Sequence, residues 1–70
     1  MDRQPVASSN IRSIGYNSSD QVLEIEFNDG SVYHYFGVPQ FEYQGLMTAS
    51  SHGTYLAKNI KNKYTYKKIS

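Results

Sequence analysis

The segment QVLEIEFN, residues 21–28, alternates apolar and acidic side chains with a period of two residues. The apolar residues of one face are Leu23, Ile25 and Phe27, and the acidic residues of the other face are Glu24 and Glu26. This pattern predicts a half-buried antiparallel strand, because only one of the two faces can join a hydrophobic core. The Asn-Asp-Gly that follows favours a turn, which returns the chain into a second strand, SVYHYF. A hairpin over 21–36 is therefore the element around which the rest of the chain must fold.

The turn allows two registers, and they point the tyrosines of the second strand in opposite directions. A two-residue turn at Asp29 and Gly30 would place Tyr33 and Tyr35 on the acidic face. A three-residue loop over 28–30 would use Gly30 as the left-handed residue of a bulge. The pairs in this second register are Ile25 with Tyr33, Leu23 with Tyr35 and Glu24 with His34. We favour it because it gathers the aromatic side chains on the apolar face and sets a carboxylate opposite an imidazole.

The remaining patterns predict one strand before this hairpin and two helices after it. Residues 10–17 have strand character, and a polar turn at 18–20 follows them. A helix is expected near 39–48, because Tyr43, Leu46 and Met47 have helical spacing. A second helix near 54–63 would begin at Thr54 as its N-cap. The segment YTYKKIS at the end could form a short last strand or an ordered tail.

We therefore expect an α+β domain of the order β-β-β-α-α. A small three-stranded antiparallel sheet over about 10–37 would have both helices packed on one face. The expected core residues are Leu23, Ile25, Phe27, Tyr33, Tyr35, Leu46, Leu56 and Ile60. Seventy residues correspond to a single domain, 1–70, whose polar residues 1–9 are expected to be flexible.

Composition excludes several classes of site and structure. The chain contains no cysteine, which rules out disulfides and zinc sites built on thiolates. No apolar run approaches the roughly 20 residues that span a bilayer, and residues 1–10 do not resemble a signal peptide. We therefore expect a cytoplasmic monomer that does not associate with membranes.

Charge is distributed unevenly along the chain. Residues 1–42 carry two arginines against six acidic residues, a net charge of −4, whereas residues 43–70 carry five lysines and no acidic residue, a net charge of +5. Lysines can neutralise phosphates, and aromatic side chains can stack on unpaired bases. The candidate nucleic-acid-binding residues are Lys58, Lys61, Lys63, Lys67, Lys68, Tyr55, Tyr64 and Tyr66. The alternative is that the tyrosines seal the core and the lysines only keep the chain soluble.

No pattern of catalytic or cofactor-binding residues is evident. His34 opposite Glu24 could form a base and its orienting carboxylate, but an open sheet face offers no pocket for a substrate. The adjacent Ser51 and His52 have little weight as a nucleophile and base, because such groups normally meet through the fold, and Ser51 suits a cap or turn. The glycines are scattered and form no phosphate-binding loop. We expect a protein that is not an enzyme and that has no cofactor or metal.

The order of these residues resembles the KTSC domain family over nearly the whole chain. The matching features up to the first helix are Ser8-Ser9, Ile14-Gly15-Tyr16, the segment from Leu23 to Phe27, Asp29-Gly30, Tyr33 and Tyr35, and Val38-Pro39. Those after it are Tyr43, Leu46, Ala49, Ser51, Gly53, Tyr55, Ile60 and Tyr64. One departure is Leu56-Ala57, where members of the family often carry Phe-Asn; a site that used this Asn would be altered here.

The resemblance implies a small domain of the kind found alone in bacterial and phage proteins, and at the C-terminus of some lysyl-tRNA synthetases. That context implies RNA, tRNA-like or single-stranded, as the partner, and we expect a nucleic-acid-binding module with RNA preferred over DNA. The alternative is a protein-interaction or regulatory module with a protein partner on the open sheet face. The residues of that face are Val22, Glu24, Val32, His34 and Phe36.

Overall fold

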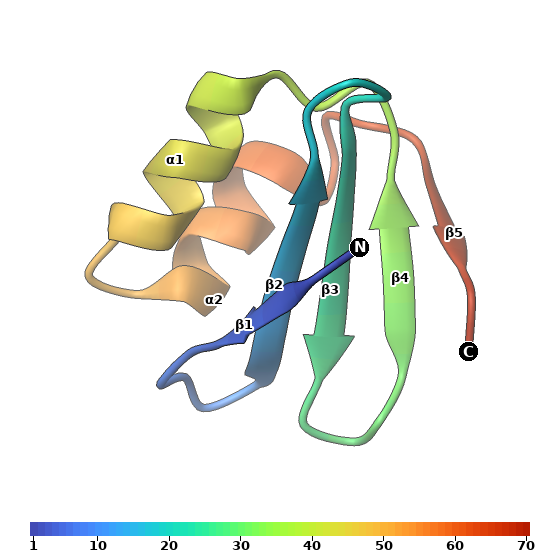
Figure 1. Ribbon diagram of the computed structural model, residues 1–70. Coiled ribbons are helices and arrows are strands. Elements are labelled where there is room, and N and C mark those ends of the chain that lie inside the picture. The colour runs from blue at the N-terminus through green and yellow to red at the C-terminus, as the bar shows by residue number, and fades with distance from the viewer.

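The protein is a five-stranded antiparallel sheet with one layer of short helices on one side (Figure 1). The computed structural model describes residues 1–70. The strands are β1 (Arg3–Pro5), β2 (Ile11–Asn17), β3 (Val22–Phe27), β4 (Val32–Tyr35) and β5 (Tyr66–Lys68). The helical elements are α1 (Gln40–Thr48), α2 (His52–Tyr55) and the π-helical turn η1 (Leu56–Ile60). The strand order in the sheet is β1-β2-β3-β4-β5, with every neighbouring pair antiparallel.

The three-stranded sheet expected from the sequence is therefore wrong, although the α+β class stands. The two strands that were not counted, β1 and β5, lie at the edges of the sheet and have three residues each. All of their residues are exposed, so no alternation of apolar and polar side chains marks them. Backbone hydrogen bonds extend the attachment of β5 beyond its ends: the Phe36 N–H donates to the Thr65 carbonyl at 2.9 Å and the Ile69 N–H to the Val32 carbonyl at 2.7 Å.

The favoured hairpin register is confirmed. Ile25 lies opposite Tyr33, Leu23 opposite Tyr35 and Glu24 opposite His34. Gly30 has a φ of +90° and its N–H donates to the Phe27 carbonyl at 2.9 Å. The Asp29 carboxylate accepts from both the backbone N–H of Ser31, at 3.0 Å, and its hydroxyl, at 2.7 Å. The left-handed glycine and this aspartate turn together set the register.

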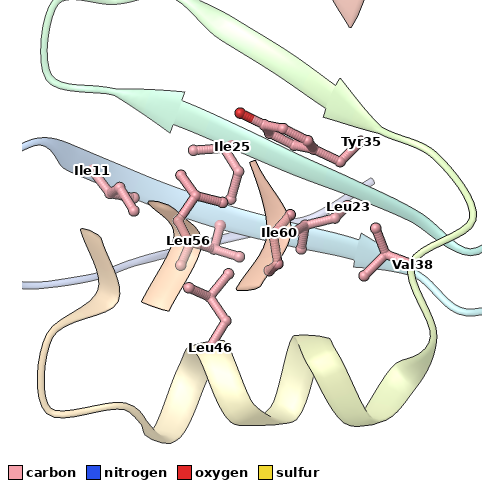
Figure 2. Packing of buried hydrophobic residues seen from close by; sticks show 9 residues of the cluster. Ile11, Leu23, Ile25, Tyr35, Val38, Leu46, Leu56 and Ile60 are labelled. Carbon is pink, nitrogen blue, oxygen red and sulfur yellow. The ribbon is translucent and has the colours of Figure 1, made fainter. Parts of the chain in front are cut away.

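The core lies between the helices and the side of the sheet that carries Leu23 and Ile25, called here the helix side. Figure 2 shows Leu46 reaching from α1 toward Leu56 and the sheet. The buried hydrophobic residues are Ile11, Ile14, Leu23, Ile25, Tyr35, Val38, Leu46, Leu56 and Ile60. The expected core residues Phe27 and Tyr33 are only half-buried at its edge. Ile11, Ile14 and Val38 were not in the expected set.

The second helical segment differs from the expected one in both start and form. Its N-cap is Ser51, whose hydroxyl accepts from the Thr54 N–H at 3.3 Å, and not Thr54 itself. The segment continues into η1, where the Lys61 N–H donates to the Leu56 carbonyl five residues earlier at 2.8 Å. This wider turn is characteristic of a π-helix. Of the lysines of this segment, Lys58 lies within the π-turn and Lys61 directly follows its end at Ile60.

The helices cover only part of the sheet. In Figure 1 both α-helices lie beside β2 and β3, while β4 and β5 extend past them toward the other edge. Tyr33 and Tyr35 lie opposite Lys68 and Tyr66, so the helix side continues onto β5 with aromatic side chains. The part of the helix side near β5 is thus available as a surface.

We predict that Gly30→Ala lowers the free energy of unfolding by roughly 1–2 kcal/mol, because a left-handed φ strains a residue with a Cβ. A Cβ at this position meets no neighbouring atom, so the loss measures backbone strain alone. Gly30→Asn should recover part of it, because asparagine tolerates this region. Urea unfolding of the three proteins measures the effect; an alanine variant as stable as the parent would contradict the bulged turn.

Candidate functional site

A buried carboxylate joins the helical layer to the chain that leads into β5. Glu42, in the first turn of α1, is only 3% exposed. It accepts hydrogen bonds from the Tyr55 hydroxyl at 2.7 Å, the Tyr64 hydroxyl at 3.0 Å and the Lys63 ammonium at 3.2 Å. We call these four residues the Glu42 cluster. Because Tyr55 ends α2 and the other two donors follow η1, a single carboxylate fixes three segments.

The cluster keeps its carboxylate ionised in spite of burial. Burial opposes the charged form most strongly, but the hydrogen bonds from Tyr55, Tyr64 and Lys63 outweigh it, so the pKa of Glu42 is lowered. The hydrogen bond to Glu42 raises the pKa of the Tyr55 hydroxyl to about 12. Burial and the same carboxylate raise the pKa of Tyr64. Both phenols therefore remain donors at physiological pH, as a buried anion requires.

Gly45 in the middle of α1 allows Tyr55 to reach the carboxylate. A Cβ at position 45 would overlap the Tyr55 hydroxyl and lie 2.8 Å from the ring carbon Cζ. The tyrosine ring thus crosses directly over the backbone of α1. The glycine permits this close approach between two helices. In exchange, it lowers the intrinsic helix propensity of α1 relative to alanine.

Three of the eight candidate residues predicted from the sequence belong to the Glu42 cluster: Tyr55, Lys63 and Tyr64. Their polar atoms are bonded to Glu42, and the Lys63 ammonium also lies 5.7 Å from the centre of the Tyr64 ring. Glu42 itself was missed. The available signal was its position four residues before Leu46, which places a carboxylate on the buried face of α1.

The other five candidates lie on exposed positions of η1, its C-terminal end and β5. Lys58 and Lys61 are exposed, and neither of them forms an ion pair within the domain. Lys67 pairs with His34 and points to the open side of the sheet, whereas Tyr66 and Lys68 pair with Tyr35 and Tyr33 and point to the helix side. The structure therefore separates Lys67 from the other candidates.

A cleft of about 470 Å³ opens on the helix side, beyond the cover of the helices. Its aromatic lining is Phe27, Tyr33, Tyr35 and Tyr66. Lys61 lines the same cleft, and its polar lining is Ser9, Asn10, Asn28, Asp29 and Ser31. We call it the aromatic cleft. Tyr66 is 59% exposed, and its ring centre lies 5.8 Å from those of both Tyr33 and Tyr35.

Two further hollows adjoin the aromatic cleft at shared residues. One contains Lys58 and shares Ser9 and Asn10 with the cleft. The other contains Lys63 and Tyr64 and shares Lys61 and Tyr66 with it. We call the three adjoining hollows together the lysine groove; Lys58 lines one of them, Lys63 another, and Lys61 both the latter and the aromatic cleft. Residues up to 57 positions apart in sequence are thus brought to one surface.

The open side of the sheet is organised differently. The Glu24 carboxylate lies 2.7 Å from the Nε2 atom of His34 and 3.3 Å from the Arg3 guanidinium. The backbone of Asp2 and the side chain of Arg3 press against Gly15, where a Cβ would lie 2.9 Å and 3.0 Å from them. The N-terminal segment thus covers part of this side. Phe36, at 38% exposure, remains accessible and lies edge-on to His34.

Neither a metal cluster nor a membrane-spanning helix is found. No three histidine, aspartate or glutamate side chains gather where they could hold a metal ion. None of the helices has the length and apolar character needed to cross a bilayer.

Residues 7–64 match the family model described as the KTSC domain. An uncharacterised protein of Stutzerimonas stutzeri is 39% identical over 70 residues, which cover 99% of each chain. A lysine–tRNA ligase of Trichormus variabilis is 44% identical over 60 residues, which are 86% of this chain but only 11% of the ligase. The crystal structure of a KTSC domain protein from Yersinia pestis superimposes with a TM-score of 0.95 at 43% identity, covering 99% of this chain and 97% of that one.

We predict that Gly45→Ala destabilises the protein by roughly 1–3 kcal/mol, because the new methyl group would collide with the Tyr55 ring. In an ordinary exposed helix the same change would stabilise by about 1 kcal/mol. Gln44→Ala, at the exposed neighbouring position of α1, is the matched control and should have a small effect. Chemical unfolding of each variant and the parent measures the effect. A Gly45→Ala variant more stable than the parent would contradict the close packing of Tyr55 on Gly45.

We also predict that acid removes the stabilisation supplied by Glu42. Its folded pKa lies below the ordinary value of 4.5, so its contribution is complete above about pH 4.5 and is lost as the pH falls through the lower folded pKa. Glu42→Gln lacks this contribution at every pH. The difference in unfolding free energy between the two proteins should therefore shrink with acidification. Asp29 also has a lowered pKa, but it is present in both proteins, so its contribution cancels in the difference. A difference independent of pH would contradict an ionised Glu42.

Proposed function

Because the chain belongs to the KTSC domain family, we propose that it is a non-enzymatic module that binds single-stranded nucleic acid, RNA in preference to DNA. The observation that carries the proposal is the lysine groove, which includes the aromatic cleft. Preference for RNA is supported by the lysine–tRNA ligase relative, whose name gives tRNA as the ligand of that enzyme. We propose that the module acts in the cytoplasm as a monomer.

The groove combines the two features that single-stranded binding requires. Ammonium groups spaced along a groove follow the phosphate backbone, and aromatic rings between them stack on the bases. Lys58 and Lys61 are exposed and can turn toward phosphates. The Lys63 ammonium, in contrast, already donates a hydrogen bond to Glu42 and is less free to contact a phosphate. Lys58 and Lys61 are therefore proposed as the main phosphate contacts, and Lys68 beside the cleft as a supporting one.

The aromatic contacts differ from those expected from the sequence. Tyr55 and Tyr64 use their hydroxyls on Glu42 and are half-buried, so their rings have limited freedom to stack. Tyr66 is exposed and stands at the mouth of the cleft. We propose that Tyr66 and the cleft tyrosine Tyr33 meet the bases.

A protein-docking role for the open side of the sheet is the second candidate. The exposed ring of Phe36 favours it, and Val22 and Val32 lie half-buried on the same side of the sheet. Arg3 and His34, however, already contact the Glu24 carboxylate, and the N-terminal segment covers Gly15. The open side therefore offers less free charge and less free area than the lysine groove.

We predict that the domain binds a mixed pool of single-stranded RNA with an affinity that falls as salt rises. The three proposed phosphate contacts, from Lys58, Lys61 and Lys68, correspond to a slope of log K against log salt of about −2. Lys58→Gln and Lys61→Gln should each weaken binding and make the slope shallower by about 0.7, because each removes one contact. Fluorescence anisotropy between about 50 and about 200 mM salt measures these slopes.

Lys67→Gln is the matched control, since it removes the same charge from the opposite side of the sheet. It should leave the affinity and the slope nearly unchanged. No RNA binding at low salt, or equal losses for the three variants, would overturn the proposed interface.

A further inference from the structure

We propose that the aromatic cleft receives one unpaired nucleobase, with the adjoining phosphate held by Lys61. The inference rests on the proposed function and deepens it, because it assigns a ligand group to one part of the lysine groove. A groove that binds only the backbone needs lysines alone. The rings at its centre add a stacking contact, which a flat base satisfies and a phosphate chain does not.

The geometry of the rings supports a stacking platform. The Phe27 ring packs against Tyr33 in an edge-to-face arrangement, with 5.5 Å between the ring centres and an angle of 85° between the planes. Tyr35 lies nearly parallel to Tyr33, with an angle of 25° and 6.5 Å between the ring centres. Tyr66 is tilted by 46° and 39° to these two rings and forms the exposed flank. A flat group that enters the cleft thus meets rigid rings on the sheet and one accessible ring on β5.

The cleft has the volume of a small-ligand site and a polar group that contacts solvent. Its volume of about 470 Å³ falls within the range of about 300–1,000 Å³ of small-molecule pockets. The hydroxyl of the buried Tyr35 has no hydrogen-bond partner within the protein, yet no side-chain polar atom is both buried and unpartnered. The hydroxyl must therefore touch solvent, and Tyr35 lines the cleft. A ligand in the cleft can accept or donate a hydrogen bond there.

The far wall of the cleft can pair with the edge of a base. Asn28 uses its amide nitrogen on the Ser8 and Ser9 carbonyls, which leaves its carbonyl oxygen Oδ1 as an acceptor. The Asn10 oxygen accepts from the Ser8 hydroxyl, which leaves the amide nitrogen Nδ2 as a donor. Asp29 uses one carboxylate oxygen on Ser31 and keeps the other. Donors and acceptors side by side match the mixed pattern along a base edge.

The charge arrangement fits a nucleotide as well. Lys61 lines both the aromatic cleft and the hollow next to it, so this residue lies at the boundary where a phosphate would leave the cleft. Lys58 stands at the other end, beyond Asn10. A strand that places one base in the cleft can therefore meet a lysine on either side of it.

The test compares RNA of about six nucleotides with an abasic ribose-phosphate chain of the same length and charge. The inference predicts that the RNA binds roughly 5- to 150-fold more tightly, the range expected for one stacked base. Tyr66→Leu should remove most of this preference and Tyr66→Phe should keep it, because only the ring is needed. Phe41→Leu is the matched control, since Phe41 is 66% exposed on α1 and lies outside the cleft.

The alternative outcomes distinguish failure of the base site from failure of the proposed function. Equal, salt-dependent binding of the RNA and the abasic chain would overturn the base site and leave the lysine groove standing. Absence of binding by either chain at low salt would overturn the proposed function and the base site together. Binding of N-acetyltryptophanamide more tightly than a nucleoside monophosphate, with quenching of tyrosine fluorescence that Tyr66→Leu abolishes, would assign the cleft to a protein side chain instead.

Discussion

The buried carboxylate of Glu42 is the interaction on which the arrangement of this domain depends. Removing a carboxylate from water is unfavourable unless it is hydrogen-bonded and paired, and here two phenols and one ammonium supply those partners. The donors come from α2 and from the segment between η1 and β5. The need to satisfy a single charge therefore determines how both segments lie against α1. Gly45 makes the arrangement possible, because any side chain there would exclude the Tyr55 ring.

This constraint divides the basic and aromatic residues of the C-terminal half into two groups with different roles. Tyr55, Lys63 and Tyr64 hold the fold together, so their polar atoms are already engaged. Lys58, Lys61 and Tyr66 take no part in the cluster and remain accessible. The hydrogen bonds inside the domain thus leave a groove in which free lysines flank an aromatic cleft. Charge counted along the sequence cannot make this distinction, because both groups contain the same residue types.

The central hairpin was predictable from the sequence because its signals are local, and the same patterns identified six of the nine buried hydrophobic residues. Alternation over 21–28 and the left-handed requirement at Gly30 together led to the observed register. The edge strand β1 was not predicted, and β5 was left as one of two alternatives, because both strands are short and exposed and are held through backbone hydrogen bonds. The N-cap was misplaced at Thr54, since Ser51 and Thr54 are both good caps and only the position of the first turn decides between them. The partners of Glu42 and the cleft could not be predicted, because they arise from contacts between segments at least 13 residues apart.

Chemical-shift mapping of the isotope-labelled domain during titration with a short single-stranded RNA tests the central claim most directly. If the Glu42 cluster displays the lysine groove as a binding surface, the backbone amides that shift will be those of Tyr33, Lys61 and Tyr66. Amides of Glu42 and Tyr55 should keep their positions, because the cluster that supports the groove stays intact. Shifts confined to Glu24, His34 and Phe36 on the open side, or shifts of the Glu42 cluster without those of the cleft, would contradict this view of the molecule.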